Sequence, residues 1–141
     1  MKVIGDVVLK TPSLGKEKKW EVVQEISLIY SGYKLTIHPG YKTDGASIPR
    51  IVWDSIGHPM STYFITAALF HDILYDSEAM PREWTDEMFG RVLLESGVGK
   101  VREWLMEISV KMFGGCTWKK HTPASIEKAN SYLTIIAPDH L

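Results

Sequence analysis

The sequence contains a single cysteine, Cys116, so no disulfide can form within the chain. This usage fits a reducing compartment and excludes the small disulfide-rich folds of secreted proteins. Neither sign of charge dominates, because 16 lysines and arginines nearly balance 17 aspartates and glutamates. The net charge of −1 gives no broad basic face of the kind that nucleic-acid-binding proteins present, so nucleic acid is not an expected partner.

Long hydrophobic runs are also missing. The longest apolar stretch extends from Phe64 to Phe70, whereas a helix needs roughly 20 apolar residues to cross a bilayer. No secretory leader is expected, because Gly5-Asp6 interrupts the apolar start of the chain. We therefore expect a protein of the cytoplasm without a membrane span.

The sequence contains enough apolar residues to form one hydrophobic core. Of the 141 residues, 45% are apolar and 23% are charged, which is the ordinary range of a globular domain. We find no internal repeat, low-complexity tract or linker. Residues 1–141 are therefore expected to form a single domain.

Alternation of apolar and polar residues predicts β-strands between about residues 1 and 45. The alternation is strongest on either side of Ser31-Gly32, which predicts a hairpin with a short turn. Pro39-Gly40 ends or bends the second strand, and residues 41–43 are expected to continue the sheet. The apolar positions are Trp20, Val22, Ile26, Leu28 and Tyr30 in one strand, and Tyr33, Leu35 and Ile37 in the next.

Helical patterns follow from about residue 48 to residue 135. Strands first and helices after predict an α+β fold, in which a small antiparallel sheet from the N-terminal half packs against a C-terminal helical bundle. The expected helices are a short one from near Ser47 to before Gly57, then about 61–76, 81–96 and 98–113, and a last one from Thr122-Pro123 through Leu133.

A polar pair, His71-Asp72, lies in the middle of an apolar segment that extends from Phe64 to Leu74. A helix that is apolar all round is buried. A buried carboxylate must be hydrogen-bonded, paired with a cation or bound to a metal. One interpretation is a structural polar network, in which Arg82 neutralises Asp72 and Asp86 meets His71 if the following helix faces this one.

The other interpretation is a divalent metal site, with zinc or manganese as the expected ion. The candidate ligands are His71, Asp72, Asp86 and His58, and Asp44 is a further residue that could complete the shell. A metal would offset the charge of Asp72 and could activate a water molecule. The spacing matches no established metal motif, so both interpretations stay open.

A second polar segment joins the expected sheet to the first helix. Asp44 and Ser47 lie in a tight turn that contains Gly45, and loops at such junctions often carry binding residues. Turn chemistry explains them equally well, with Asp44 accepting backbone N–H groups and Ser47 capping a helix. The catalytic candidates are therefore Asp44, Ser47, His71 and Asp72, and no cofactor-binding fingerprint is present. The other histidines, among them His121, are expected in solvent or in turns.

Together these segments resemble a phage- and prophage-encoded family, domain of unknown function 1353, over about residues 20–118. The resemblance implies a bacteriophage or prophage source, and hence the cytoplasm of a bacterial host or the virion. It also implies one shared site made of Asp44, Ser47, His71, Asp72, Arg82 and Asp86. The matching residues are Pro39-Gly40-Tyr41 with Tyr in place of the usual Phe, Thr43 to Arg50, Ala67 to Tyr75, Arg82, Asp86, Phe89, Phe113-Gly114 and Trp118.

Two functional hypotheses follow. The first is an accessory or virion-associated protein of the tail region that acts by binding a virion or host protein, with the cluster as a structural network. The second is a metal-dependent hydrolase that cleaves a phosphoester or a cell-wall bond with the same cluster. A small inhibitor of a host protein is a third idea, which the size and charge permit without arguing for it.

Overall fold

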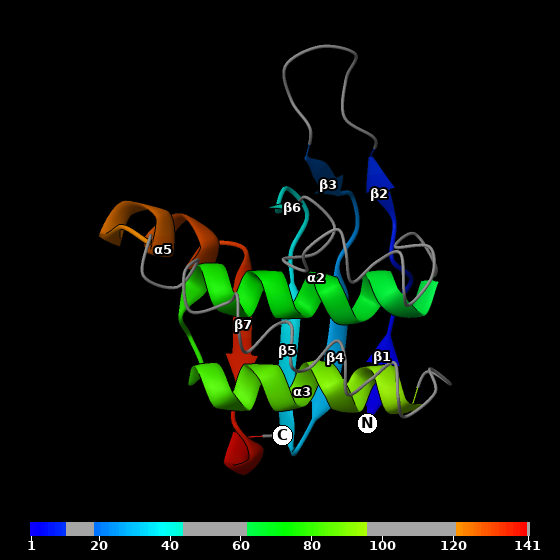
Figure 1. Cartoon of the computed structure of the whole chain (residues 1–141). Coiled ribbons are helices and arrows are strands. Elements are labelled where there is room, and N and C mark those ends of the chain that lie inside the picture. The colour runs from blue at the N-terminus through cyan, green and yellow to red at the C-terminus, as the bar shows by residue number, and fades with distance from the viewer. Residues whose placement is uncertain (11–18, 44–61, 96–120, 141) are drawn as a thin grey trace, which may run out of the picture.

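The structure of the protein is a computed structural model that describes residues 1–10, 19–43, 62–95 and 121–140. The described part contains two small antiparallel sheets and three α-helices, and the helices α2 and α3 lie side by side across one face of the larger sheet (Figure 1). The α+β prediction is confirmed. The helices expected near residues 47–57 and over 98–113 lie outside the described residues.

The larger sheet has the strand order β1-β4-β5-β7, with every pair antiparallel. Its centre is the predicted hairpin at Ser31-Gly32. Both turn residues have positive φ, 50° at Ser31 and 80° at Gly32, which is the geometry that matches the twist of a tight hairpin. The strands are β1 (Lys2–Ile4), β4 (Ile26–Tyr30), β5 (Tyr33–Ile37) and β7 (Leu133–Ile136).

The smaller sheet consists of β2 (Leu9–Lys10), β3 (Trp20–Val22) and β6 (Lys42–Thr43), in the order β2-β3-β6. The prediction of one continuous strand from Trp20 to Tyr30 is wrong, because β3 and β4 belong to different sheets. The break falls around Gln24, the one polar residue on the apolar side of the pattern. Its side-chain amide donates to the carbonyl oxygen of Asp6 at 3.0 Å.

Helices α2 (Thr62–Ser77) and α3 (Arg82–Glu95) close the core against the larger sheet. Trp84 fixes α3 over the hairpin, because its ring makes edge contacts with Tyr30 and Tyr33 at 5.3 and 5.6 Å between ring centroids. No helix in the described ranges is both long enough and apolar enough to span a membrane. The largest fully buried core side chains are Ile26, Leu28, Leu35, Ile37, Leu69, Phe70, Ile73, Leu74, Tyr75, Met88, Phe89 and Leu93.

The last helix, α5 (Pro123–Asn130), begins where the sequence predicts it and ends earlier. Thr122 caps it through a capping box with Ser125, which satisfies two backbone N–H groups of the first turn. The prediction that the helix continues to Leu133 is wrong. Leu133 begins β7, which pairs with β5 from Leu133 opposite Ile37 to Ile136 opposite Lys34. The helical region therefore stops before residue 135, and the C-terminal segment completes the N-terminal sheet.

Candidate functional site

The middle of helix α2, residues 66–75, is buried on all sides, as its sequence predicts. The apolar residues from Ala67 to Tyr75 are each at most 1% exposed. His71 and Asp72, in the middle of this run, are 1% and 5% exposed. Two polar side chains in such surroundings are stable only if other polar groups meet them.

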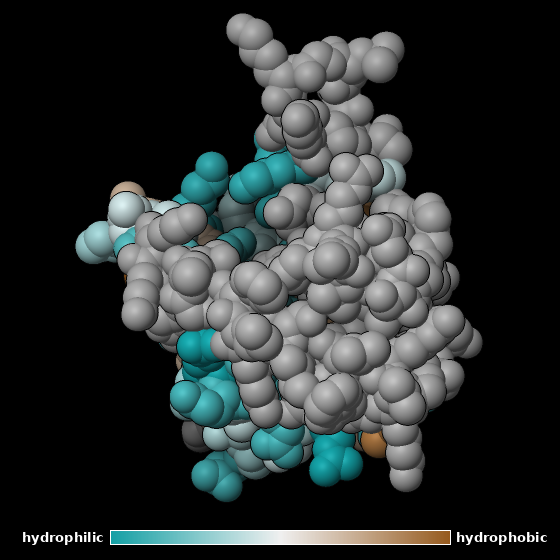
Figure 2. All heavy atoms as spheres, viewed as in Figure 1, coloured by the Kyte–Doolittle hydropathy of each residue, from teal (hydrophilic) through white to brown (hydrophobic). Residues whose placement is uncertain are grey.

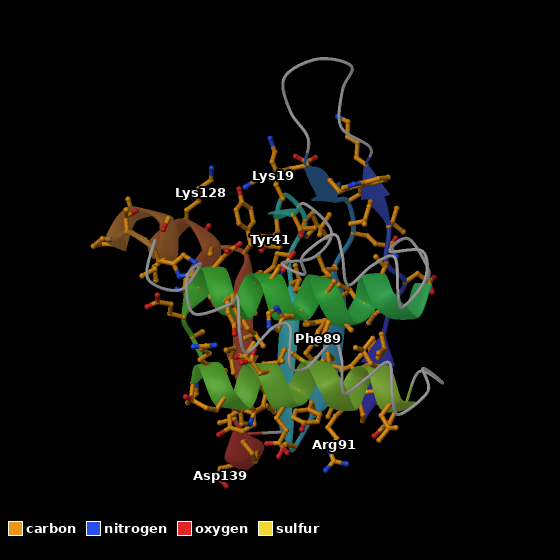
Figure 3. All side chains as sticks on the ribbon, in the orientation of Figure 1. Lys19, Tyr41, Phe89, Arg91, Lys128 and Asp139 are labelled. Carbon is orange, nitrogen blue, oxygen red and sulfur yellow. The ribbon has the colours of Figure 1, made fainter. Side chains whose placement is uncertain are left out.

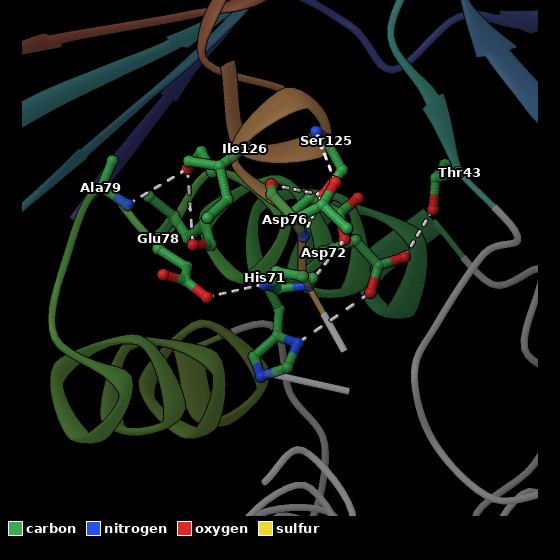
Figure 4. A network of polar contacts seen from close by, with 12 residues as sticks. Thr43, His71, Asp72, Asp76, Glu78, Ala79, Ser125 and Ile126 are labelled. Atoms are coloured by element: carbon green, nitrogen blue, oxygen red, sulfur yellow. Dashed lines mark hydrogen bonds and ion pairs between the residues drawn. The ribbon is translucent and has the colours of Figure 1, made fainter. Parts of the chain in front are cut away.

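The ring of His71 lies between two carboxylates. Its Nε2 is 3.1 Å from Oδ1 of Asp86 on α3, and its Nδ1 is 4.0 Å from Oδ1 of the adjacent Asp72. Figure 4 shows the contact with Asp72 from close by. The ring also packs against Tyr75 and Phe89, with centroids 4.2 and 5.0 Å away. The hypothesis that Asp86 meets His71 is confirmed.

Asp86 is the centre of the helix–helix contact, and it is 1% exposed. The hydroxyl of Tyr75 donates to its Oδ1 at 2.6 Å. Nε of Arg82 lies 3.7 Å from its Oδ2 and donates to the Tyr75 hydroxyl at 3.2 Å. Arg82 thus contacts Asp86, and among the described residues the imidazole of His71 lies beside Asp72.

Asp72 joins the helices to the smaller sheet. Its Oδ2 accepts a hydrogen bond from the hydroxyl of Thr43 on β6, and both side chains are buried (Figure 4). We call the connected side chains Thr43, His71, Asp72, Tyr75, Arg82 and Asp86 the His71 network. The network holds α2, α3 and β6 together through polar contacts.

The structure describes four of the six residues that the resemblance assigns to one shared site. His71, Asp72, Arg82 and Asp86 come together as expected. Asp44 and Ser47 lie outside the described residues, as does His58, the further candidate metal ligand. Thr43, immediately before Asp44, is in the His71 network and was not singled out from the sequence.

The electrostatics of the His71 network favour a charged imidazole. Burial lowers the pKa of His71, but contacts with Asp72 and Asp86 outweigh it and raise the pKa above the ordinary value of 6.5. Burial also raises the pKa of Tyr75, and its hydrogen bond to Asp86 adds to the effect, so this hydroxyl stays a donor. When it is protonated, His71 offsets the charges of the two carboxylates beside it.

We predict that the free energy of unfolding falls as the pH rises above about 6.5, the ordinary value for histidine. The folded state binds the His71 proton more tightly than the unfolded chain, so this stabilisation is complete below that pH. It is lost as the pH passes the higher pKa of the folded state. Urea unfolding at a series of pH values between about 6 and 9 measures the effect.

Three other ionisable side chains face His71 in the described part of the chain. Asp72 and Asp86 are the carboxylates beside it, and the raised pKa of Tyr75 moves its proton loss further to the alkaline side. An NMR titration of the His71 ring gives the pKa directly. A midpoint below 6.5, or a free energy of unfolding that rises over this window, would contradict the prediction.

The geometry of His71 limits how the network could bind a metal. One ring nitrogen faces Asp86 and the other faces Asp72. Because the two nitrogens of an imidazole point in different directions, a single ion cannot be bound by His71 and both carboxylates in this arrangement. Within the described ranges, no group of three or more His, Cys, Asp or Glu side chains is placed to hold a metal ion.

A family model described as "Protein of unknown function (DUF1353)" matches residues 20–110, which is more than half of the chain. The chain belongs to the DUF1353 family. The matched region contains the described His71 network from Thr43 to Asp86. The sequence resemblance to this family is therefore confirmed.

Two curated proteins of Sinorhizobium fredii are similar to this DUF1353 chain. "Uncharacterized protein y4iH" is 36% identical over 73 residues, and "Uncharacterized protein y4jT" is 27% identical over 84 residues. The matches cover 52% and 60% of this chain but only 30% and 25% of the two relatives, so the chain spans less than a third of their length. No solved structure matches the chain.

This DUF1353 chain has a second polar group that the sequence did not reveal. His121 was expected in solvent or in a turn; it lies in irregular chain just before α5, but its side chain is only 10% exposed, so the expectation of a solvated ring is wrong. Its Nδ1 is 2.9 Å from Oε1 of Glu78, and its Nε2 is 3.7 Å from Oδ1 of Asp76. Asp76 also accepts a hydrogen bond of 2.6 Å from the hydroxyl of Tyr41.

One signal in the sequence points to part of this second group. Asp72 and Asp76 are four residues apart and therefore lie on the same side of α2. Nothing local indicates His121, which precedes α5 and meets α2 only because α5 packs against that helix. His121 also lies beyond the residues that the family model matches.

Proposed function

We propose that this protein is a phage- or prophage-encoded accessory or virion-associated protein of the tail region, which acts by binding a protein partner from the virion or the host. It acts in the cytoplasm of a bacterial host or in the assembled particle. The observation that supports binding over catalysis by the His71 network is burial. His71, Asp72 and Asp86 are at most 5% exposed, and a catalytic side chain must touch its substrate.

The contacts inside the His71 network support the same proposal. Asp86 accepts hydrogen bonds from Tyr75 and His71, and Asp72 accepts one from Thr43. Each of these bonds joins two different elements of the fold. Buried polar networks whose groups are satisfied rigidify a fold and specify one packing arrangement. Such a network serves a protein that presents a fixed surface to a partner.

The proposal predicts that the protein is recovered with phage particles or with one specific protein. A tagged copy is expressed in a lysogen, the prophage is induced, and the lysate is separated by sedimentation and by affinity capture. We expect the tag in the particle fraction or a single stoichiometric partner in the capture. Recovery of the protein alone, in both separations, would contradict the proposal.

A metal-dependent hydrolase that cleaves a phosphoester or a cell-wall bond is the competing proposal. It is favoured by a histidine with a carboxylate on each side, since these are metal-ligand types. It would need an arrangement of His71, Asp72 and Asp86 different from the described one. Residues such as Asp44 or His58 would then complete the coordination shell of a zinc or manganese ion. In the binding proposal Asp72 is a structural hydrogen-bond acceptor, whereas in the hydrolase proposal it is a metal ligand.

Asp72→Asn separates these two proposals. If the His71 network is structural, the variant loses about 1.5–3 kcal/mol of unfolding free energy, because a buried hydrogen bond to a charged group is weakened. Elemental mass spectrometry of the untagged wild-type protein should then find no stoichiometric metal. Asp139→Asn, at an exposed position, is the matched control (Figure 3). About one metal per chain, with an Asp72→Asn variant as stable as wild type, would favour the hydrolase.

A further inference from the structure

A groove of about 870 Å³ lies between α5, the C-terminal end of α2 and the smaller sheet. It is separate from the buried His71 network and reaches the surface, where hydrophilic side chains surround it (Figure 2). Its volume is within the range of roughly 300–1,000 Å³ that is typical of small-molecule sites. Three kinds of lining group bear on what the groove could bind, and the carboxylate of Glu21 lines it as well.

Lysines make up the first kind. Lys19 and Lys42 line the groove from the side of β3 and β6, and Lys128 lines it from α5. Figure 3 shows Lys19 and Lys128 on the same upper side of the fold as Tyr41, and the two lysines come from different segments of the chain. Among the described residues, neither Lys19 nor Lys128 forms an ion pair with a carboxylate. Ammonium groups that line one groove attract an anion.

Two tyrosines make up the second kind. The rings of Tyr41 and Tyr132 are 6.3 Å apart and tilted by 57°. Tyr132 rests on the backbone of Gly40, where a Cβ atom would be only 2.8 Å from its Cε1, and Gly40 has a φ of +105° that favours glycine. The aromatic corner is therefore built into the fold; Tyr41 is 4% exposed, so the partly buried Tyr132 is the tyrosine that offers a face to a ring.

Hydrogen-bonding groups make up the third kind. Asp76 and the largely buried His121 line the groove, and Glu78 fixes the orientation of the His121 ring. Burial raises the pKa of Asp76, and the Tyr41 hydrogen bond opposes that shift without cancelling it. These oriented groups can select hydroxyl and amine substituents on a ligand.

We propose that the groove binds a small anionic ligand that carries a ring. The phosphate or carboxylate of the ligand is held by the groove lysines, and its ring lies against Tyr132, whose side chain is only partly buried. A nucleotide and an acidic sugar share this chemistry. The proposal goes beyond the function proposed above and does not rest on it, because it concerns a small molecule and a different part of the protein.

Isothermal titration calorimetry of the full chain with adenosine monophosphate, glucuronic acid and inorganic phosphate tests this proposal. We expect at least one of the two ring-bearing probes to bind saturably and about ten-fold or more tighter than inorganic phosphate, because the aromatic corner contributes only to a ligand with a ring. The ring-bearing probe that binds more tightly shows whether the ligand belongs to the nucleotides or to the acidic sugars. Equal or weaker binding of both ring-bearing probes, or no binding of any probe, would overturn the proposal.

A double variant, Lys19→Ala with Lys128→Ala, shows whether the groove itself binds the ligand. Both side chains are exposed, so the variant should remain folded, and thermal unfolding checks this. We expect about ten-fold weaker binding. The control is Lys2→Ala with Lys10→Ala, which removes the same charge from exposed positions that do not line the groove. Equal affinity of the two double variants would place the anion elsewhere and overturn the proposal.

Discussion

Asp86→Ala is expected to lower the free energy of unfolding by about 3–5 kcal/mol, the loss typical of breaking a buried ion pair. The substitution removes the acceptor of the Tyr75 hydroxyl and of His71 Nε2. The Tyr75 hydroxyl and His71 Nε2 are then left without an acceptor. Because His71 is only 1% exposed, water cannot take the place of the carboxylate. Urea unfolding at neutral pH, followed by circular dichroism, measures the change.

The control for this prediction is Glu87→Ala, the next residue of α3, which is exposed. It should change the free energy of unfolding by no more than about 0.5 kcal/mol. Asp86→Asn retains most of the shape and removes the charge, so we expect an intermediate loss together with a lower pKa of His71. An Asp86→Ala variant as stable as the Glu87→Ala control would show that the His71 network does not hold α3 against α2.

The centre of the fold was predictable from the sequence because its signals are local. The apolar run around His71-Asp72 predicted a buried helix, and burial required a polar partner whatever its identity. The spacing of Arg82 and Asp86 on the next helix then left few candidates, and Asp86 is the partner of His71. The hairpin at Ser31-Gly32 was predictable for the same reason, since alternation and turn residues lie next to each other.

The features that were missed depend on contacts between distant parts of the chain. Leu133 has a helical spacing from Ala129, but its pairing with Ile37 on β5 places it in a strand. His121 is buried by residues that lie more than 40 positions earlier, such as Glu78. Periodicity within a short window carries no information on either contact.

The His71 network and the groove meet along α2. Asp72 belongs to the network, and Asp76, one helical turn later, lies at the groove. The negative charge of Asp72 adds to the burial that raises the pKa of Asp76. The position of α2 therefore determines the geometry of both the His71 network and the groove. The packing of α2 against α3 stabilises that position.

Phe89 is a buried apolar side chain of α3 that packs against His71 of α2, and Phe89→Ala is expected to cost about 3–5 kcal/mol of unfolding free energy. Its side chain on α3 is 1% exposed, and its ring lies 5.0 Å from that of His71 at an angle of 59° (Figure 3). Truncation removes buried apolar surface and leaves a cavity beside a charged imidazole. Water entering that cavity would reduce the electrostatic effect of Asp86 on His71, so the pKa of His71 should also move toward its ordinary value.

Two comparisons separate the packing contribution of Phe89 from a general effect of substitution on α3. Phe89→Leu keeps an apolar side chain and should cost less than Phe89→Ala, whereas Arg91→Ala on the exposed side of the helix should cost no more than about 0.5 kcal/mol. Urea unfolding and the NMR titration of His71 are measured on all three variants. If Phe89→Ala behaved like Arg91→Ala, the polar contacts of Asp86 alone would hold the two helices together. A large loss in both Phe89→Ala and Asp86→Ala would mean that the polar and apolar contacts of α3 are each required.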